Sequence, residues 1–193
     1  MESNEDRLER AIAFASRAHR GAYRKGTRIP YILHPLEAAA IVSSMTDDMD
    51  VMAAAVLHDV LEDTPVTVGQ VRAAFGDRIT DLVCAETEDK REGQRASDTW
   101  RIRKQETVDG LRREPRLEVK MIALGDKLSN IRAINRDCQV LGDALWARFN
   151  QSDKAQIHWY YRSFADAIAE LSAFPAWKEL DRLIRETFEP SLK

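Results

Sequence analysis

The feature that most constrains this chain is an apolar run, Ala53–Leu57, that leads directly into four ionisable residues: His58, Asp59, Glu62 and Asp63. The segment has strong helix formers and no Gly or Pro up to residue 64, so it predicts a buried helix within residues 50–62. Residues four apart share a helix face, which would stack His58 with Glu62 and Asp59 with Asp63. Ionisable groups are costly to bury beside Ala, Val and Leu unless something neutralises them. A divalent cation would do so.

His58 and Asp59 offer adjacent nitrogen and oxygen ligands. A site of two histidines and two carboxylates suits Mn, Fe, Zn or Mg better than a metal that prefers thiolates. An isolated His-Asp pair is more often a hydrogen-bonded pair in the core. Here the pair is not isolated, because His34-Pro35 precedes it and Gly125-Asp126-Lys127 follows it. We therefore expect a metal site whose other ligands come from distant parts of the chain.

Composition narrows the class of protein. A length of 193 residues with 44% apolar content suits one domain with a substantial core. Basic and acidic residues nearly balance, 29 against 32, and no long basic block indicates nucleic-acid binding, although a small anion is still a possible ligand. Cys84 and Cys138 belong to no Cys/His cluster, which indicates a reducing cytoplasm. The acidic segment 1–7 has no apolar signal core, and no apolar stretch predicts a membrane span.

Apolar residues recur at helical spacing along the chain, and no segment shows a sustained strand pattern, so we predict an all-α fold. Short strands are possible within residues 22–32, and residues 86–98 are expected to be irregular. The first helix should end near Gly21, and Pro35 should lie in the first turn of the second. The predicted helices cover residues 8–18, 35–45, 50–62, 68–75, 77–84, 100–111, 117–134, 153–171 and 177–188.

The order His34, His58-Asp59, Asp126 is similar to the metal-binding signature of HD-domain phosphohydrolases. More narrowly, residues 24–36, 57–64 and 125–132 resemble the hydrolase domain of RelA/SpoT-type proteins. The resemblance covers about residues 8–165. It implies a single HD-type helical bundle over residues 1–193, with the C-terminal helices of 153–188 packed on its core. It also implies that His34, His58, Asp59 and Asp126 hold a cation.

Family members of this length are stand-alone small alarmone hydrolases, similar to the metazoan SpoT homologue. The resemblance implies Mn²⁺, or another divalent cation, and removal of the 3′-pyrophosphate of guanosine tetra- or pentaphosphate by a metal-activated water. A bound cation lowers the pKa of its water and polarises a phosphoryl oxygen, which suits this reaction. Glu62 is placed to orient or deprotonate that water, and Asp63 to assist proton transfer or hold a hydrogen bond. Spacing does not decide which carboxylate has which task.

A nucleotide substrate with several negative charges needs basic partners. Arg24 and Lys25, in the loop before His34, are similar to family residues that contact the base and phosphates, and further candidates follow Asp126 or lie near residue 160. Their alternative interpretation is ordinary solvated surface, or core packing for the aromatic residue. The substrate-binding candidates are Arg24, Lys25, Lys127, Asn130, Arg132, Lys154 and Tyr161.

The chain departs from the family pattern at Gly125, where Ala is common, and at Ala123 and Ser129. None of these departures removes a ligand, so we still expect the chain to hydrolyse its substrate. What the departures put in doubt is which substrate it uses. Two alternatives stay open. One is an HD phosphohydrolase acting on another nucleotide, such as a deoxynucleotide or an NADPH-type phosphoester. The other is a nucleotide-binding module with little turnover, against which the intact Glu62 and Asp63 argue.

Overall fold

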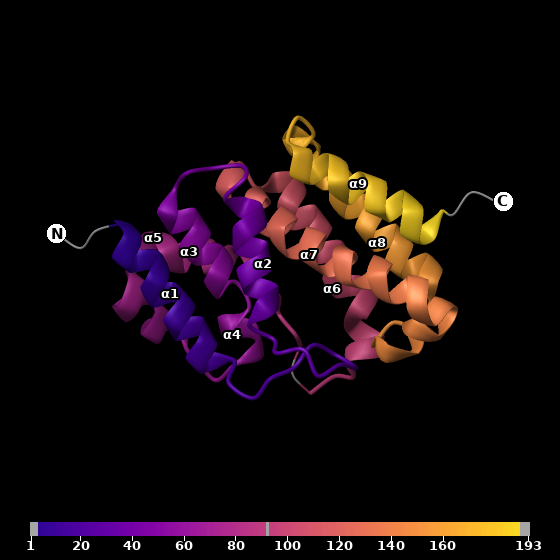
Figure 1. Ribbon diagram of the computed structural model, residues 1–193, viewed down its shortest axis with the longest axis horizontal. Helices are drawn as coiled ribbons and strands as arrows, with labels where there is room; N and C mark the ends of the chain where they lie inside the picture. The colour runs from indigo at the N-terminus through magenta and orange to yellow at the C-terminus, as the bar shows by residue number, and fades with distance from the viewer. Residues whose placement is uncertain (1–3, 92, 190–193) are drawn as a thin grey trace. The chain divides into compact units, whose positions relative to one another are not determined.

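The computed structural model describes residues 4–91 and 93–189, and the regular elements within these ranges are helices (Figure 1). An isolated antiparallel bridge between Tyr23 and Pro30 is the extended pairing found there. The prediction of an all-α fold is confirmed. Residues 1–3, at the start of the acidic segment, and residues 190–193, at the end of the predicted domain, lie outside the described residues. The helices are α1 (Asn4–Ala18), α2 (Leu33–Val42), α3 (Met49–Leu57), α4 (Val60–Asp63), α5 (Val68–Glu86), α6 (Ala96–Arg113), α7 (Leu117–Leu141), η1 (Gly142–Arg148), α8 (Lys154–Ala167), η2 (Ala169–Leu171) and α9 (Pro175–Phe188).

The chain forms two compact units, which are described separately. The first unit comprises residues 1–87 and 116–126, and the second comprises residues 88–115 and 127–193. Helix α7 contributes its first residues to the first unit and the rest to the second. The organisation as a single HD domain stays a prediction. None of the described helices is long and apolar enough to cross a membrane.

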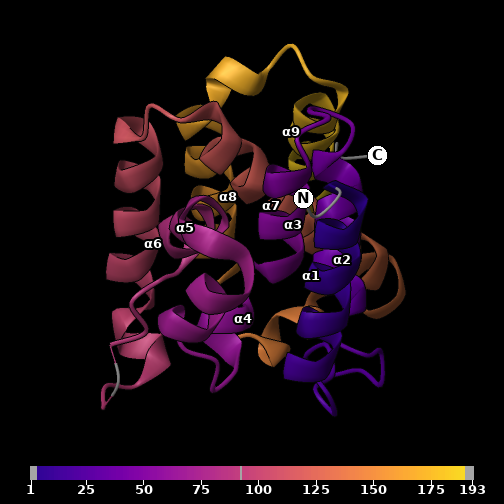
Figure 2. The same cartoon turned by 90° about the vertical axis from the view of Figure 1, so that its left-hand side faces the viewer.

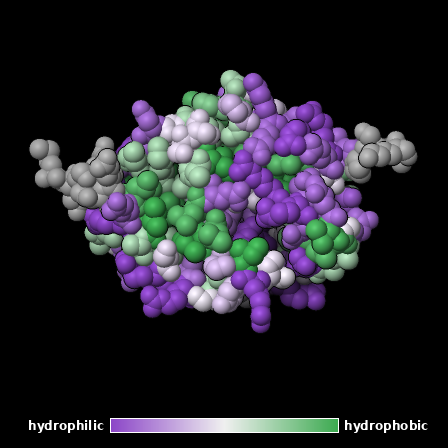
Figure 3. Space-filling model, viewed as in Figure 1, coloured by the Kyte–Doolittle hydropathy of each residue, from purple (hydrophilic) through white to green (hydrophobic). Residues whose placement is uncertain are grey.

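In the first unit, α1, α2 and α5 all pack against α3. Helix α3 is buried along its whole length from Val51 to Leu57, because it is apolar on every face and therefore needs neighbours on every side. Figure 3 shows mainly apolar residues on the face of this unit near α2. The core of the unit therefore surrounds the helix that leads into His58.

The predicted continuous helix over residues 50–62 is wrong at one point, because the chain breaks between α3 and α4. Nδ1 of His58 lies 2.8 Å from the carbonyl oxygen of Ala55, the group that would accept from the Asp59 amide in an unbroken helix. Asp59 has φ −90° and ψ −4°, at the edge of helical space. The amide of Asp63 still donates to the carbonyl of Asp59 at 2.9 Å, so these two residues stay one turn apart.

Helix α5 contains the predicted stop at Gly76. Its φ of 80° lies in the left-handed region, so the residues on either side form two helical segments that meet at a kink. The first segment begins at the predicted cap, Thr67, whose side chain accepts from the amide of Gln70 while the Gln70 side chain accepts from the amide of Thr67. The cap and the stop predicted from the local sequence are therefore both confirmed in this part of the chain.

In the second unit, α8 packs against both α6 and α9 and lies between them in Figure 2. The rings of Trp100 on α6 and Tyr160 on α8 meet edge to face, with centroids 5.9 Å apart. Several predicted boundaries differ by a few residues, and three of the differences are larger. Helix α6 begins at Ala96, inside the segment expected to be irregular, α7 runs past residue 134 to Leu141, and the helix predicted for 153–171 ends at Ala167 before the separate turn η2. Such shifts of a few residues at helix ends are expected, since packing decides them.

Candidate active site

The predicted ligands lie together in the first unit. His34 comes from α2, His58 from the end of α3 and Asp126 from α7, and all three are buried, with one ligand atom of each within 4.8 Å of the others. The fourth predicted ligand, Asp59, places Oδ2 3.0 Å from Nε2 of His58 and 3.4 Å from Nε2 of His34. Three helices distant in the sequence therefore direct two histidines and two carboxylates to one point.

The spacing of these atoms fits a bound divalent cation. Nitrogen and oxygen ligands lie about 2.1 Å from such an ion, so ligands on adjacent corners lie roughly 3 Å apart. Oδ1 of Asp126 lies 3.1 Å from Nε2 of His34 and 3.8 Å from Nε2 of His58. Nδ1 of His58 is engaged by the Ala55 carbonyl, which leaves the lone pair of Nε2 toward the carboxylates. Among the described residues this buried nitrogen makes no hydrogen bond of good geometry, although Oδ2 of Asp59 lies 3.0 Å away, which suits a nitrogen that a metal ion would bind.

The charges of the cluster are strongly coupled. Burial alone would lower the pKa of His58, but the carboxylates of Asp59 and Asp126 outweigh burial and raise that pKa to about 10. Burial likewise opposes ionisation of Asp59, yet His58 and His34 hold the pKa of its carboxyl well below its usual value. Without a cation, a proton on the His58 imidazole therefore balances the carboxylate. A metal ion has to displace that proton, because only neutral imidazole is a ligand.

Gly125 explains how α7 reaches the site. A Cβ atom at this position would lie 2.7 Å from the carbonyl oxygen of Ala38 and 2.9 Å from Cγ2 of Val42, both on α2. No other residue type fits such a close approach without movement of one helix. Because α2 carries His34 and the residue after Gly125 is Asp126, the contact sets the separation of two predicted ligands. The departure from the family's common Ala thus has a packing role.

The two predicted catalytic carboxylates lie on the short helix α4, which follows the cluster. Glu62 is half-buried and Asp63 is exposed. Oδ2 of Asp63 accepts from the hydroxyl of Tyr31 at 2.9 Å, and the same hydroxyl lies 2.7 Å from Oδ2 of Asp59. Burial, together with these two carboxylates, raises the pKa of Tyr31 far above its ordinary value, so the phenol keeps its hydrogen. Sequence reasoning missed Tyr31, although Pro30-Tyr31 stands inside the motif that precedes His34.

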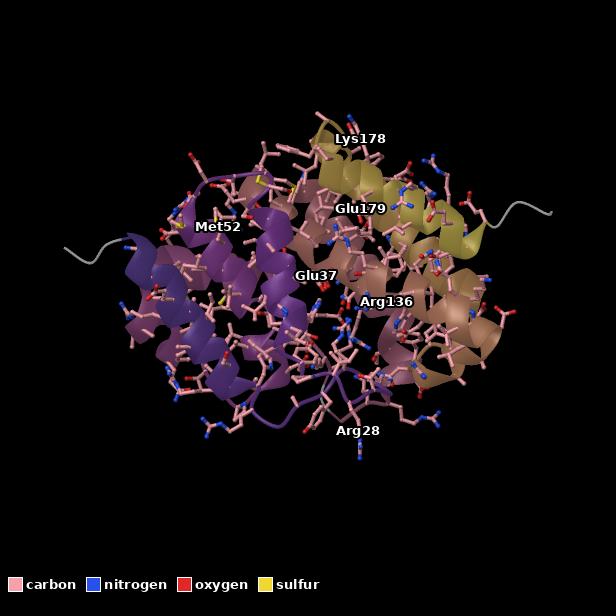
Figure 4. The ribbon with its side chains drawn as sticks, viewed as in Figure 1. Arg28, Glu37, Met52, Arg136, Lys178 and Glu179 are labelled. Carbon is pink, nitrogen blue, oxygen red and sulfur yellow. The ribbon has the colours of Figure 1, made fainter. Side chains whose placement is uncertain are left out.

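The loop between α1 and α2 carries the predicted basic residues Arg24 and Lys25. Arg24 is half-buried, with its guanidinium carbon 5.7 Å from the centroid of the Tyr31 ring, and Lys25 is exposed. Arg28, further along the loop, is exposed and points away from the helices in Figure 4. The ring of His19 lies 4.9 Å from that of Tyr31, and burial lowers the pKa of this histidine. Arg24 is thus the loop cation held next to the carboxylate cluster.

The other substrate-binding candidates belong to the second unit. Arg132 donates two hydrogen bonds to the carboxylate of Glu179, labelled in Figure 4, at 2.8 and 2.7 Å, so a substrate would have to share its guanidinium. Lys127 places Nζ 6.0 Å from the ring centroids of Tyr160 and of Phe164. For these residues the contact with substrate stays a prediction.

The last three candidates have different surroundings. Lys154 is the first residue of α8, and its Nζ lies 3.5 Å from Oδ1 of Asp143 in η1. Tyr161 is buried, with its ring centroid 5.9 Å from that of Phe188, which favours the packing role left open by the sequence. Asn130 is half-buried on α7. For Lys154, Tyr161 and Asn130 as well, the contact with substrate stays a prediction.

The all-helical fold and the cluster of two histidines and two aspartates define the class of protein. A family model described as HD domain matches residues 11–151, and the chain belongs to the HD-domain family. More particularly, it is similar to the human guanosine-3′,5′-bis(diphosphate) 3′-pyrophosphohydrolase MESH1. The two are 35% identical over 149 residues, and this aligned region covers 70% of this chain and 74% of the human protein. The expected resemblance to RelA/SpoT-type hydrolase domains is confirmed.

Longer relatives match over a smaller part of their length. The Aquifex aeolicus guanosine-3′,5′-bis(diphosphate) 3′-pyrophosphohydrolase is 31% identical over 129 residues, which are 67% of this chain but 18% of that protein. The chain therefore spans less than a fifth of this relative. Among solved structures, a metazoan ortholog of SpoT, described as hydrolysing ppGpp, superposes with a TM-score of 0.76 at 25% identity, covering 96% of this chain and 97% of its own. A Listeria monocytogenes protein gives a TM-score of 0.70 at 30% identity, over 83% of this chain and 96% of its own.

Proposed function

We propose that this protein is a metal-dependent hydrolase that removes the 3′-pyrophosphate of guanosine tetra- or pentaphosphate, converting ppGpp to GDP and pyrophosphate. The observation that carries the proposal is the buried cluster of His34, His58 and Asp126, with Oδ2 of Asp59 3.0 Å from Nε2 of His58. The human relative MESH1 is named for this reaction.

The ligand set is His34, His58, Asp59 and Asp126, and Mn²⁺ is the cation we assign to it, since nitrogen and carboxylate ligands suit that metal. When bound, the cation supplies Lewis-acid polarisation and a lowered pKa for water. Glu62 accepts the proton of the attacking water, whose oxygen forms a bond to the phosphorus attached to the ribose 3′ oxygen. The bond between that phosphorus and the 3′ oxygen breaks, and the 3′ oxygen takes up the proton that Glu62 accepted from the water, with Asp63 assisting the transfer.

Substrate binding in this proposal begins with the loop cations. Arg24 and Lys25 neutralise phosphate charge, and Arg24 is the better ordered of the two because it is half-buried over Tyr31. Lys127, Asn130 and Lys154 are secondary candidates. Arg132 and Tyr161 are weaker candidates for substrate contact, since Arg132 is hydrogen-bonded to Glu179 and Tyr161 is buried among aromatic rings.

The proposal also covers the setting of the enzyme. We assign it to the cytoplasm, as a single HD domain that acts on a small nucleotide and has no nucleic-acid partner. The near balance of charge, with 29 basic and 32 acidic residues, and the absence of a cysteine cluster support this assignment.

Turnover of a panel of nucleotides tests the function directly. Purified protein, stripped of metal and reloaded with Mn²⁺, Mg²⁺ or Zn²⁺, is incubated with ppGpp, pppGpp, NADPH and deoxynucleotides, and the products are resolved by ion-exchange chromatography. We expect pyrophosphate and GDP from ppGpp with Mn²⁺. Glu62→Gln should lose about 10²–10⁴-fold in turnover while keeping its affinity for Mn²⁺, because it removes a general base and no ligand.

The other outcomes separate the alternatives. Turnover of NADPH or a deoxynucleotide alone would replace the alarmone with another substrate of the same metal chemistry. Binding of ppGpp by the wild type with no product at any metal would contradict hydrolysis and identify a binding module.

A further inference from the structure

The hydroxyl oxygen of Tyr31 contacts two of the predicted functional carboxylates of the first unit, Asp59 and Asp63. Its hydroxyl lies 2.7 Å from Oδ2 of Asp59 and 2.9 Å from Oδ2 of Asp63. The same Oδ2 of Asp59 lies 3.0 Å from Nε2 of His58. A carboxylate oxygen has two acceptor directions, so the phenol can occupy one and leave the other toward the histidines. The hydroxyl thereby fixes the orientation of a predicted ligand.

The ring of Tyr31 contacts a different set of neighbours. One neighbour is the buried ring of His19, at 4.9 Å, and another is the guanidinium of Arg24, at 5.7 Å from the ring centroid. A cation at this distance from an aromatic ring is attracted by it. The ring therefore supports the loop cation, while the hydroxyl supports the carboxylates.

The backbone closes the loop onto Tyr31. The amide of Tyr31 donates to the carbonyl of Ala22 at 2.9 Å, next to the bridge between Tyr23 and Pro30. Within the segment between Ala22 and Tyr31, the amide of Arg24 donates to the carbonyl of Ile29 at 2.9 Å. A shift of Tyr31 therefore moves the segment that carries Arg24.

From these contacts we infer that Tyr31 is a positioning residue that couples the metal-ligand cluster to the basic loop: its hydroxyl holds Asp59 and Asp63, and its ring holds Arg24. The inference rests on the proposed function, and it assigns a role in that site to a residue outside the ligand set. Groups that hydrogen-bond to metal ligands typically change metal affinity by about 10–100-fold when they are removed. Loss of the hydroxyl and loss of the ring should have separable effects.

Two substitutions separate these effects. Tyr31→Phe removes the hydroxyl and keeps the ring, so we expect Mn²⁺ affinity to fall by about tenfold or more, with the KM for ppGpp nearly unchanged at saturating Mn²⁺. Tyr31→Leu also removes the ring, so the same loss of affinity should be joined by a rise in KM. The matched control is Tyr23→Phe, which removes a hydroxyl from a ring in the same loop that is 58% exposed, and it should change neither quantity.

Mn²⁺ affinity is measured by titration calorimetry without nucleotide, so it does not depend on the identity of the substrate. Wild-type affinity in Tyr31→Phe would overturn the inference. If the wild type binds Mn²⁺ and cleaves no ppGpp, the proposed substrate is wrong, while a loss of affinity in Tyr31→Phe still supports the role of Tyr31.

A second measurement uses the wild type alone and so does not depend on whether the variants fold. Amide hydrogen exchange over residues 22–31 is followed with and without Mn²⁺. We expect slower exchange with Mn²⁺, because ordering Asp59 orders the residue that closes the loop. Unchanged exchange across this segment at saturating Mn²⁺ would overturn the coupling.

Discussion

At the scale of single residues, His58 has two states that exclude each other. Asp59 and Asp126 hold its pKa at about 10 against the opposing effect of burial, so without metal the imidazole is charged at neutral pH. As a ligand the same imidazole has to be neutral. Metal binding therefore has to remove one proton from a group that is buried next to two carboxylates.

We expect Mn²⁺ binding to release about one proton near pH 7 and the apparent affinity to rise roughly tenfold per pH unit until the pH approaches 10. Calorimetry in buffers with different ionisation enthalpies measures the released proton. His158→Ala is the control, since that histidine stacks on Phe188 in the second unit and should leave the pH dependence intact. An affinity that does not change between pH 6 and 9 would contradict this account of His58.

At the scale of the helices, the signals that succeeded are local ones. Thr67 as a cap and Gly76 as a stop act within a few residues, so the sequence alone predicted both. The break after Leu57 depends on a side chain that takes a backbone acceptor inside its own helix, which periodicity cannot reveal. The contact of Tyr31 with Asp59 spans 28 residues of sequence, so only the packed fold displays it.

The approach of α7 to α2 gives a prediction about Gly125. Gly125→Ala places a Cβ against the Ala38 carbonyl and Val42, so the helices must separate. We expect a loss of about 1–3 kcal/mol in the free energy of unfolding, as for other overpacked contacts, together with weaker Mn²⁺ binding, because Asp126 moves away from His34. Denaturant unfolding and Mn²⁺ titration measure the two effects.

The control for this substitution is Gly110→Ala in α6. A Cβ at that position meets nothing within 4 Å, so the variant should be as stable as the wild type or up to about 1 kcal/mol more stable. If Gly125→Ala kept both its stability and its metal affinity, the close contact would not set the ligand separation.

At the scale of the whole molecule, the four predicted ligands all belong to the first unit, whereas five of the seven substrate candidates belong to the second. The motif order in the sequence predicted that the first group would lie together, and the structure brings these residues together. For Lys127, Arg132 and Tyr161 the contact with substrate stays a prediction, since basic and aromatic residues also have common roles in packing and ion pairs. Arg132 illustrates this with its two hydrogen bonds to Glu179.

Because only the folded chain assembles the ligand cluster, Mn²⁺ should raise the melting temperature of the whole protein. Free Mn²⁺ at 100 times its dissociation constant corresponds to about 2.7 kcal/mol of stabilisation. Thermal melts with increasing Mn²⁺, followed by chelation, test this. Asp126→Asn should lose most of the increase, and an equal increase in that variant would indicate that the ion binds elsewhere.

One further consequence comes from the hydroxyl of Tyr31, which has a single hydrogen and two carboxylate neighbours. This one hydrogen has to serve both oxygens, so Asp59 and Asp63 cannot be repositioned independently. A movement of the predicted ligand Asp59 would thus be passed to α4 through a single hydroxyl group.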